Sequence, residues 1–177
     1  MAAPARMLEG QIVELVHEMT QRGLRIPILV QASPDDQHAQ APEIASAIRR
    51  LESAQYAGLS ILSDTLSPRA YRDLFGGVVV QPYRAEDFKD RVSGVTLDAL
   101  SAGCPAVVTA HTWMAEVVQR FDAGVATADL SARGLLAAIE TVLADYGRYA
   151  ANAKTAAREL NAQHSARRML EVVLRGS

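Results

Sequence analysis

The chain has 177 residues, of which 49% are hydrophobic and 5% aromatic, and its formal net charge is -2 at pH 7. This length fits a single domain with a sizeable apolar core, and richness in alanine, valine and leucine favours helices on a small sheet over an all-β sandwich. The near-neutral charge gives no reason to expect general nucleic-acid binding.

Helical and strand patterns alternate along the first half of the chain. Apolar residues at helical spacing predict a helix that starts near Leu8 and ends at Gly23, a residue typical of helix C-caps. Ser67 followed by Pro68 predicts the start of a short helix. The predicted segments are a strand in 25–33, a polar loop in 34–42, a helix in 44–51, a strand in 58–64, a short helix from 67 and a strand in 76–83.

The second half continues this alternation and then becomes helical. The predicted segments are a polar loop in 84–91, a helix in 93–102, strands in 105–110 and 123–127 with a helix in 113–121 between them, and helices from 131 to about 146 and on to 174. Strands that alternate with helices indicate a parallel sheet with right-handed crossovers. We therefore predict one α/β domain, residues 1–177, with a doubly wound, Rossmann-like sheet of about five strands and a helical extension in 146–177.

Cysteine and histidine give no sign of a disulfide or a metal site. The one cysteine, Cys104, is predicted to be a small buried hydrophobic residue, and His17, His38 and His164 lack partners at ligand spacing. No segment approaches the ~20 apolar residues of a membrane span, and the first residues lack the apolar stretch of a signal peptide. A cytoplasmic protein is expected.

One predicted helix start has the residues of an anion site. Open parallel sheets bind ligands at the carboxyl ends of their strands, and Ser93 and Gly94 open the helix that follows the third predicted strand. Unpaired amides and the helix dipole favour a phosphate there, and glycine removes a side chain that would hold the phosphate away. Asp98, one turn further on the same face, can accept hydrogen bonds from the hydroxyls of a ribose.

Two further residues are candidates for the same ligand. Asp90, in the loop before this helix, can accept hydrogen bonds from the other end of the ligand, and His111 lies at the end of the fourth predicted strand. An acid between Lys89 and Arg91 is also what an exposed charged loop contains. The residues alone therefore indicate a nucleotide or phosphate ligand and nothing narrower.

This segment resembles the donor-binding motif of retaining glycosyltransferases of the GT-B fold, which have two facing Rossmann-like domains. Their motif has two acids separated by seven residues, then small residues, Gly, Pro and a valine-rich strand. Asp90 and Asp98 have this spacing, and "LDALSAGCPAVVTA" matches the continuation. The loop sequence "RVSGV" is similar to the R-S-S-G-V of one subgroup, and the likeness covers roughly residues 8–174.

The resemblance implies residue roles. Asp98 would bind the ribose, the amides near Gly94 the diphosphate, and backbone around Leu66 the base. The full implied set is Asp90 as the catalytic residue beside the donor sugar, with Leu66, Arg91, Ser93, Gly94, Val95, Asp98 and His111 as donor-binding residues.

Two positions depart from the family pattern. Both acids of the motif are Asp where the family usually has Glu, which shortens each side chain by one methylene. Glu9 stands about where the family has a Lys for the diphosphate, and its carboxylate would repel phosphate. Arg6 is the nearest alternative cation.

The reaction that the resemblance implies is transfer of a hexosyl group from a nucleoside diphosphate sugar to a hydroxyl acceptor, with retained anomeric configuration. No metal or other cofactor is implied, because helix N-termini and basic residues stabilise the leaving diphosphate. The acceptor site would lie on an N-terminal domain missing from this chain, so the chain alone is expected to be inactive. Glu9 and the missing half favour an alternative: a non-catalytic nucleotide-binding or protein-interaction module of the same fold. A nucleotide-sugar epimerase is a third possibility.

Two expectations concern surfaces. From residue 148 to the end there are six basic residues against two acidic ones, which fits a solvated helix face or a weak contact with an anionic membrane surface. Residues 1–7 are too few and too poor in β-branched types to form the central first strand of the family. We therefore expect Ile28–Val30 and Val78–Val80 to pair directly in one continuous sheet, with self-association of the chain as an accompaniment.

Overall fold

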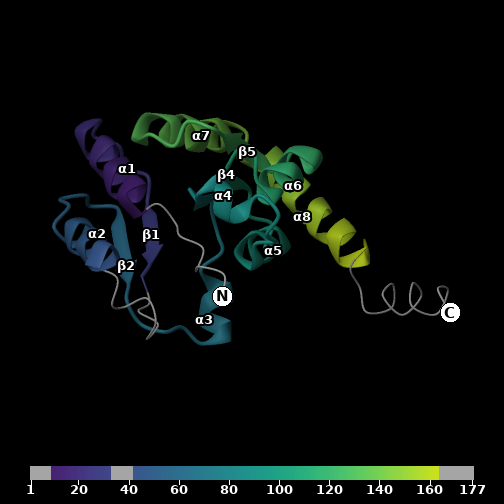
Figure 1. Cartoon of the computed structure of the whole chain (residues 1–177), viewed down its shortest axis with the longest axis horizontal. Helices are drawn as coiled ribbons and strands as arrows, with labels where there is room; N and C mark the ends of the chain where they lie inside the picture. The colour runs from purple at the N-terminus through teal and green to yellow at the C-terminus, as the bar shows by residue number, and fades with distance from the viewer. Residues whose placement is uncertain (1–8, 33–41, 164–177) are drawn as a thin grey trace.

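The computed structural model describes residues 9–32 and 42–163. Its five strands are β1 (Ile28–Gln31), β2 (Leu59–Leu62), β3 (Val79–Gln81), β4 (Ala106–Thr109) and β5 (Gly124–Thr127). Its helices are α1 (Glu9–Gln21), α2 (Pro42–Glu52), α3 (Pro68–Asp73), α4 (Ala85–Phe88), α5 (Gly94–Ser101), α6 (Trp113–Phe121), α7 (Ala132–Ala144) and α8 (Tyr146–Gln163). All strand pairs are parallel, so the predicted Rossmann-like α/β class, with its helical C-terminal region, is confirmed (Figure 1).

Capping residues set the ends of several helices. The C-cap glycine predicted for α1, Gly23, has a φ of 62°, in the left-handed region that glycine tolerates best. Hydroxyl side chains cap four helix N-termini by accepting a hydrogen bond from a backbone amide of the first turn. These N-caps are Ser67 of α3, Ser93 of α5, Thr112 of α6 and Ser131 of α7.

The sheet is divided in two, which contradicts the expected continuous sheet. Within the described residues β1 pairs with β2 alone, and β3 pairs with β4 in the order β3-β4-β5. The predicted hydrogen bonds between Ile28–Val30 and Val78–Val80 are therefore wrong. The residues before Leu8, whose failure to form a strand motivated that expectation, lie outside the described residues, as does Leu8 itself.

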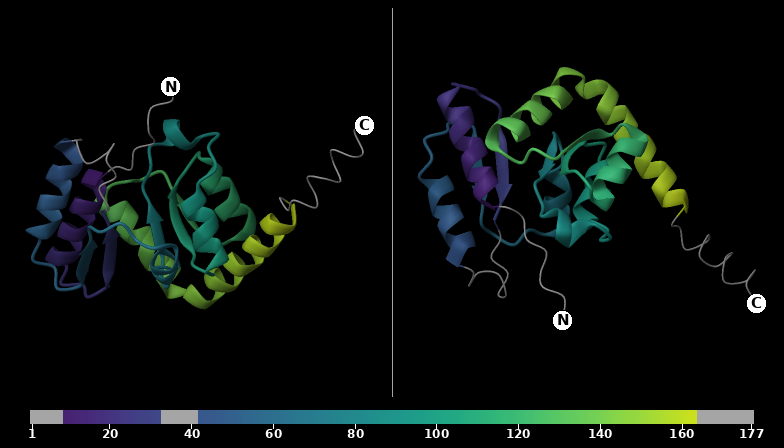
Figure 2. Two further views of the ribbon diagram at one scale, coloured as in Figure 1. Left: turned by 90° about the horizontal axis from the view of Figure 1, so that it is seen from below. Right: turned by 45° about the horizontal axis from the view of Figure 1, so that its top comes forward.

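A shared helical layer joins the two sheets where strand pairing does not. Side chains of α1 and α7 belong to one core cluster, against which Ile28 and Val30 of β1, Val80 of β3 and Val78 just before β3 all pack. In Figure 2 α7 reaches from the side of α1 to the side of β5. Burial of apolar surface has no preferred direction, so these helices can hold both sheets without hydrogen bonds between them.

One predicted loop contains a turn of helix. The segment 84–91 was predicted as a polar loop, but α4 forms within it. Phe88 is buried and stacks on the ring of Tyr83, with 4.2 Å between ring centroids. Phe88 also joins the core cluster of Val108 in β4 and Met114 in α6, and this tertiary burial draws the loop into a helical turn.

The centre of the larger sheet is tightly packed. All four residues of β4 are buried, and so is Cys104 before it, as predicted. Gly124 of β5 has a φ of 151°, and a Cβ at this position would overlap the carbonyl of Ala106. Only glycine allows β5 to approach β4 in this way.

Of the C-terminal helices, α7 packs on β5 and β4, and α8 packs on α5 and α6. Small residues of α8, among them Ala153 and Ala156, pack against Leu100 of α5, so the two helices lie close together. Of the helices that the structure describes, none combines the length and apolar character that a membrane span requires.

Candidate functional site

A buried polar network fixes the N-terminus of α5 against the carboxyl end of β3. Gln81, the last residue of β3, is 2% exposed. Its Nε2 donates to Oγ of Ser93 over 3.3 Å, and its Oε1 accepts from the Thr96 hydroxyl over 2.7 Å. Oγ of Ser93 also accepts from the Thr96 amide over 3.3 Å. The predicted placement of Ser93 and Gly94, at a helix start where a strand ends, is thus what the structure contains.

The first turn of α5 presents backbone amides to open space. Gly94 is exposed, and a Cβ added to it would meet no atom within 4 Å. Packing therefore does not require glycine here. The amides of Gly94 and Val95 have no acceptor among the described residues, as expected for the first positions of a helix. Unpartnered amides at a helix N-terminus are the groups that anion sites use.

Asp98 lies one turn further along α5 and is held by a residue that the sequence analysis did not identify. Oδ2 of Asp98 accepts a hydrogen bond of 3.2 Å from the hydroxyl of Tyr71 in α3. Burial, and then the Asp98 charge, raise the pKa of Tyr71 to about 12, so the phenol remains a donor at neutral pH. Oδ1 of Asp98 has no partner within the described part of the chain and stays available to a ligand.

Asp90 and Arg91 lie in the exposed loop between α4 and α5. The Arg91 guanidinium is 5.8 Å from the centroid of the Phe88 ring, so the packed ring of α4 supports the start of this loop. No hydrogen bond or ion pair joins Asp90 to Asp98 among the described residues. Asp90 thus lies before Gly94 in the sequence and Asp98 after it, and no contact joins their carboxylates within the described residues.

The loop after β4 contains a strained residue. His111 is exposed and has a φ of 61°, an uncommon backbone conformation for a non-glycine residue that costs on the order of 1–3 kcal/mol. Thr112 stabilises the turn, since its hydroxyl donates to the Thr109 carbonyl over 2.7 Å and accepts from the Ala115 amide over 3.2 Å. His111 thus lies where the sequence analysis expected it, after the end of β4.

A hydrogen bond from a threonine side chain connects the end of β4 with the loop that follows β3. The Thr109 hydroxyl, at the end of β4, donates to the carbonyl of Tyr83 over 2.7 Å. Sequence reasoning missed Gln81, Thr96, Thr109 and this contact. A glutamine at the end of the valine-rich third strand was the one available signal, because a buried polar side chain in a sheet needs partners.

The remaining predicted site residues are less connected. Leu66 is half-buried in the loop before the N-cap Ser67, and its side chain belongs to none of the three core clusters. Glu9 is the first residue of α1, and Arg6 lies outside the described residues. Among the described residues no three His, Cys, Asp or Glu side chains gather where they could hold a metal ion.

Neither the protein-family models nor the curated proteins contain a match to this sequence. Among solved structures, the chain is similar to WaaG, a glycosyltransferase involved in lipopolysaccharide biosynthesis. The TM-score is 0.54 at 16% sequence identity, and the match covers 91% of this chain and 40% of the WaaG chain. The likeness shows that the chain has a glycosyltransferase-like fold, and the chain spans well under half the length of that enzyme.

Proposed function

We propose that this chain is the donor-binding half of a retaining glycosyltransferase, with a nucleoside diphosphate sugar as its ligand. The observation that carries the proposal is the first turn of α5. There, open space beside Gly94 and two unpartnered amides lie within one helical turn of Asp98. The glycosyltransferase-like fold supports the same assignment, because parallel sheets bind ligands at the carboxyl ends of their strands.

In this proposal the diphosphate lies against the N-terminus of α5. The amides of Gly94 and Val95 donate to phosphate oxygens, and the positive end of the helix dipole favours their charge. As the bond between the anomeric carbon and the diphosphate breaks, negative charge develops on the leaving oxygen, where these donors stabilise it. The Arg91 guanidinium, in the adjoining loop, supplies a positive charge to the same group. No metal or other cofactor is required for these roles.

The remaining groups orient the two ends of the donor. Oδ1 of Asp98 accepts from a ribose hydroxyl while Tyr71 holds Oδ2 in place. The backbone around Leu66 contacts the base, Asp90 is placed beside the donor sugar as the catalytic residue, and His111 contacts the donor from the loop after β4. The hydroxyl acceptor is held by a second domain, since transfer requires donor and acceptor to be held together.

The test of this proposal is a calorimetric titration of the chain with UDP and GDP, followed by Asp98→Ala. We expect one of the two nucleotides to bind, and the variant to bind it roughly 10- to 100-fold more weakly, since hydrogen bonds to a charged group contribute about 1.5–3 kcal/mol. Tyr71→Phe removes the hydroxyl that holds the carboxylate but keeps the carboxylate itself, so it should weaken binding less than Asp98→Ala. Unchanged affinity in Asp98→Ala would show that Asp98 does not bind the ribose. If neither nucleotide binds the wild type, the proposed donor site is wrong.

The second candidate is a module of the same fold that holds a nucleotide without catalysis. It is favoured by the sequence at Glu9, an acid about where the family has a Lys for the diphosphate, because a carboxylate there repels phosphate. Asp90→Asn, assayed with the partner domain supplied, distinguishes the enzyme from the non-catalytic module. In an enzyme the wild type transfers sugar and the substitution abolishes transfer, whereas a non-catalytic module transfers none with either residue. Nucleotide affinity is unchanged by the substitution in both cases.

A further inference from the structure

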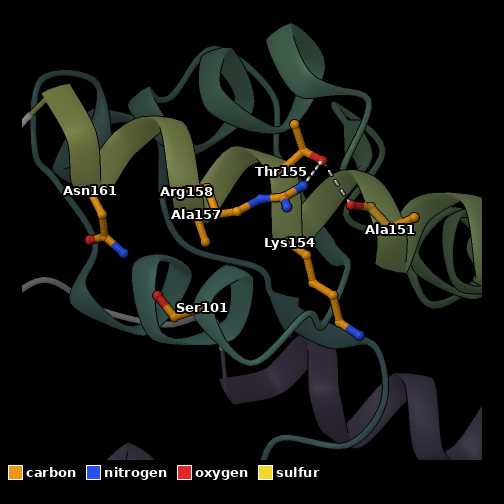
Figure 3. Close-up of a pocket in the computed structure, with 7 residues that line it drawn as sticks. All are labelled: Ser101, Ala151, Lys154, Thr155, Ala157, Arg158 and Asn161. Carbon is orange, nitrogen blue, oxygen red and sulfur yellow. Dashed lines mark hydrogen bonds between the residues drawn. The ribbon is translucent and has the colours of Figure 1, made fainter.

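A groove at the far end of α5 from the donor site lies between this helix and α8. Its volume is about 540 Å³, and it is open to solvent. The lining residues are Ser101, Ala151, Lys154, Thr155, Ala157, Arg158 and Asn161, shown in Figure 3. Ser101 is the last residue of α5, whereas Gly94 is the first, so the groove and the donor site are at opposite ends of one helix.

The groove is positively charged. Lys154 and Arg158 lie one turn apart on the same face of α8, and no acidic residue lines the groove. Neither cation has a carboxylate partner among the residues that the structure describes, whereas Arg120 pairs with Glu159 on a different face of α8. The groove therefore presents two uncompensated positive charges, with hydroxyl and amide donors beside them.

Both cations are held in position by their surroundings. The aliphatic stem of Lys154 lies over Gly103 and fills the space that a Cβ of this residue would take. Nη2 of Arg158 donates to the Thr155 hydroxyl over 3.1 Å, and that hydroxyl donates to the Ala151 carbonyl over 3.2 Å. Because these contacts already restrict the side chains, less conformational entropy is lost when an anion binds.

We propose that this groove docks the chain on an anionic phospholipid membrane by binding the phosphate of a lipid headgroup. The guanidinium of Arg158 and the ammonium of Lys154 match a phosphate in charge, and the hydroxyl of Ser101 and the amide of Asn161 supply further donors. A single soluble phosphate is held weakly by exposed cations, because solvent screens such pairs. A membrane surface adds the attraction of many headgroups, and each basic residue close to it strengthens binding roughly fivefold.

Two features favour a membrane as the occupant. The sequence after Glu159 has three further basic residues and one acidic one, so the sequence beyond the groove is basic as well. The groove is also at the end of α5 that is remote from the donor site, so a docked membrane leaves the site open to a soluble nucleotide sugar. This second argument rests on the proposed function, whereas the charge of the groove does not depend on it.

Vesicle binding by the full chain tests the proposal. The measurement is co-sedimentation with phosphatidylcholine vesicles, with and without phosphatidylglycerol. We expect binding only to the anionic vesicles, and the pair Lys154→Gln and Arg158→Gln to weaken it at least tenfold. The matched control is the pair Arg49→Gln and Arg50→Gln, which removes the same charge from exposed residues of α2 and is expected to reduce binding less than threefold.

The other outcomes are also decisive. An equal loss of vesicle binding in the two double variants would mean that net charge alone drives association, which overturns the proposal that the groove docks the membrane. Equal binding of the wild type to neutral and anionic vesicles would overturn it as well. The chain could instead bind inorganic phosphate through Lys154 and Arg158 in NMR titrations and fail to sediment with anionic vesicles. That result would indicate a soluble phosphate ligand and would also overturn the proposal. Lys154→Arg with Arg158→Lys keeps both charges and should retain vesicle binding, so loss of fold cannot be mistaken for loss of docking.

Discussion

The hydroxyl of Tyr71 in α3 donates to Oδ2 of Asp98 in α5 across 3.2 Å and connects two helices whose residues are 27 positions apart. Asp98 remains exposed, so the bond fixes the direction of its carboxylate without burying it. The carboxylate therefore has one oxygen held by the protein and one available, which is what the proposed ribose-binding role requires.

The burial of Tyr71, together with its contact with Asp98, predicts a pH dependence of stability. The pKa of Tyr71 is raised from 10.0 to about 12, so the folded chain holds this proton more tightly than the unfolded chain. The stabilisation is complete below the unfolded value of about 10 and is lost as the pH rises toward about 12. Urea denaturation across this window should show a steeper fall in unfolding free energy for the wild type than for Tyr71→Phe. Parallel curves would show that the phenol is neither buried nor bonded to Asp98 in solution.

Gly94→Val should abolish nucleotide binding while leaving the fold intact. The new side chain enters open space, so it strains nothing, but it blocks the approach of a diphosphate to the amides of α5. Calorimetry with the nucleotide that the wild type binds measures the effect. Gly147→Val is the matched control, because Gly147 also lies in the first turn of a helix with no atom within 4 Å of an added Cβ. Equal affinity in the two variants would disprove the diphosphate site.

Gly124→Ala should destabilise the chain by about 2–4 kcal/mol. Its φ of 151° is unfavourable for alanine, and the methyl group would overlap the backbone of Ala106 in the central strand. Denaturant titration followed by circular dichroism measures the change in unfolding free energy. Gly147→Ala, in the first turn of α8, should instead stabilise by up to about 0.5–1 kcal/mol. A loss below about 1 kcal/mol for Gly124→Ala would mean that β5 moves away from β4 at little cost.

The purified chain alone should not transfer sugar. We propose that it holds the donor only, and catalysis requires donor and acceptor in one geometry. The assay supplies radiolabelled nucleotide sugars with a panel of hydroxyl acceptors and detects labelled product. Turnover by the chain alone would show that it contains a complete active site.

The sequence analysis located the helix start at the candidate site because its signals are local. A capping serine needs only an amide three residues away, so Ser93 and Ser67 mark helix starts without knowledge of the fold. The alternation of strands and helices follows from hydrophobic periodicity, which is local too. The roles given to Asp90 and Asp98 came from spacing and resemblance, and nucleotide titration has yet to test them.

The tertiary structure decided what depends on residues distant in sequence. Edge hydrogen bonds between β1 and β3 were expected from two apolar strands, but the core shared with α1 and α7 holds both sheets without such bonds. The burial of Phe88 turned a polar loop into α4. Tertiary packing also brought Tyr71 beside Asp98 and the stem of Lys154 over Gly103, two contacts between residues far apart in the sequence. Local periodicity and capping thus determined which helices and strands form and in what order. Packing between distant segments decided which strand edges pair and which side chains meet. The reason is that burial of apolar surface requires apolar residues but does not specify which residues they pack against.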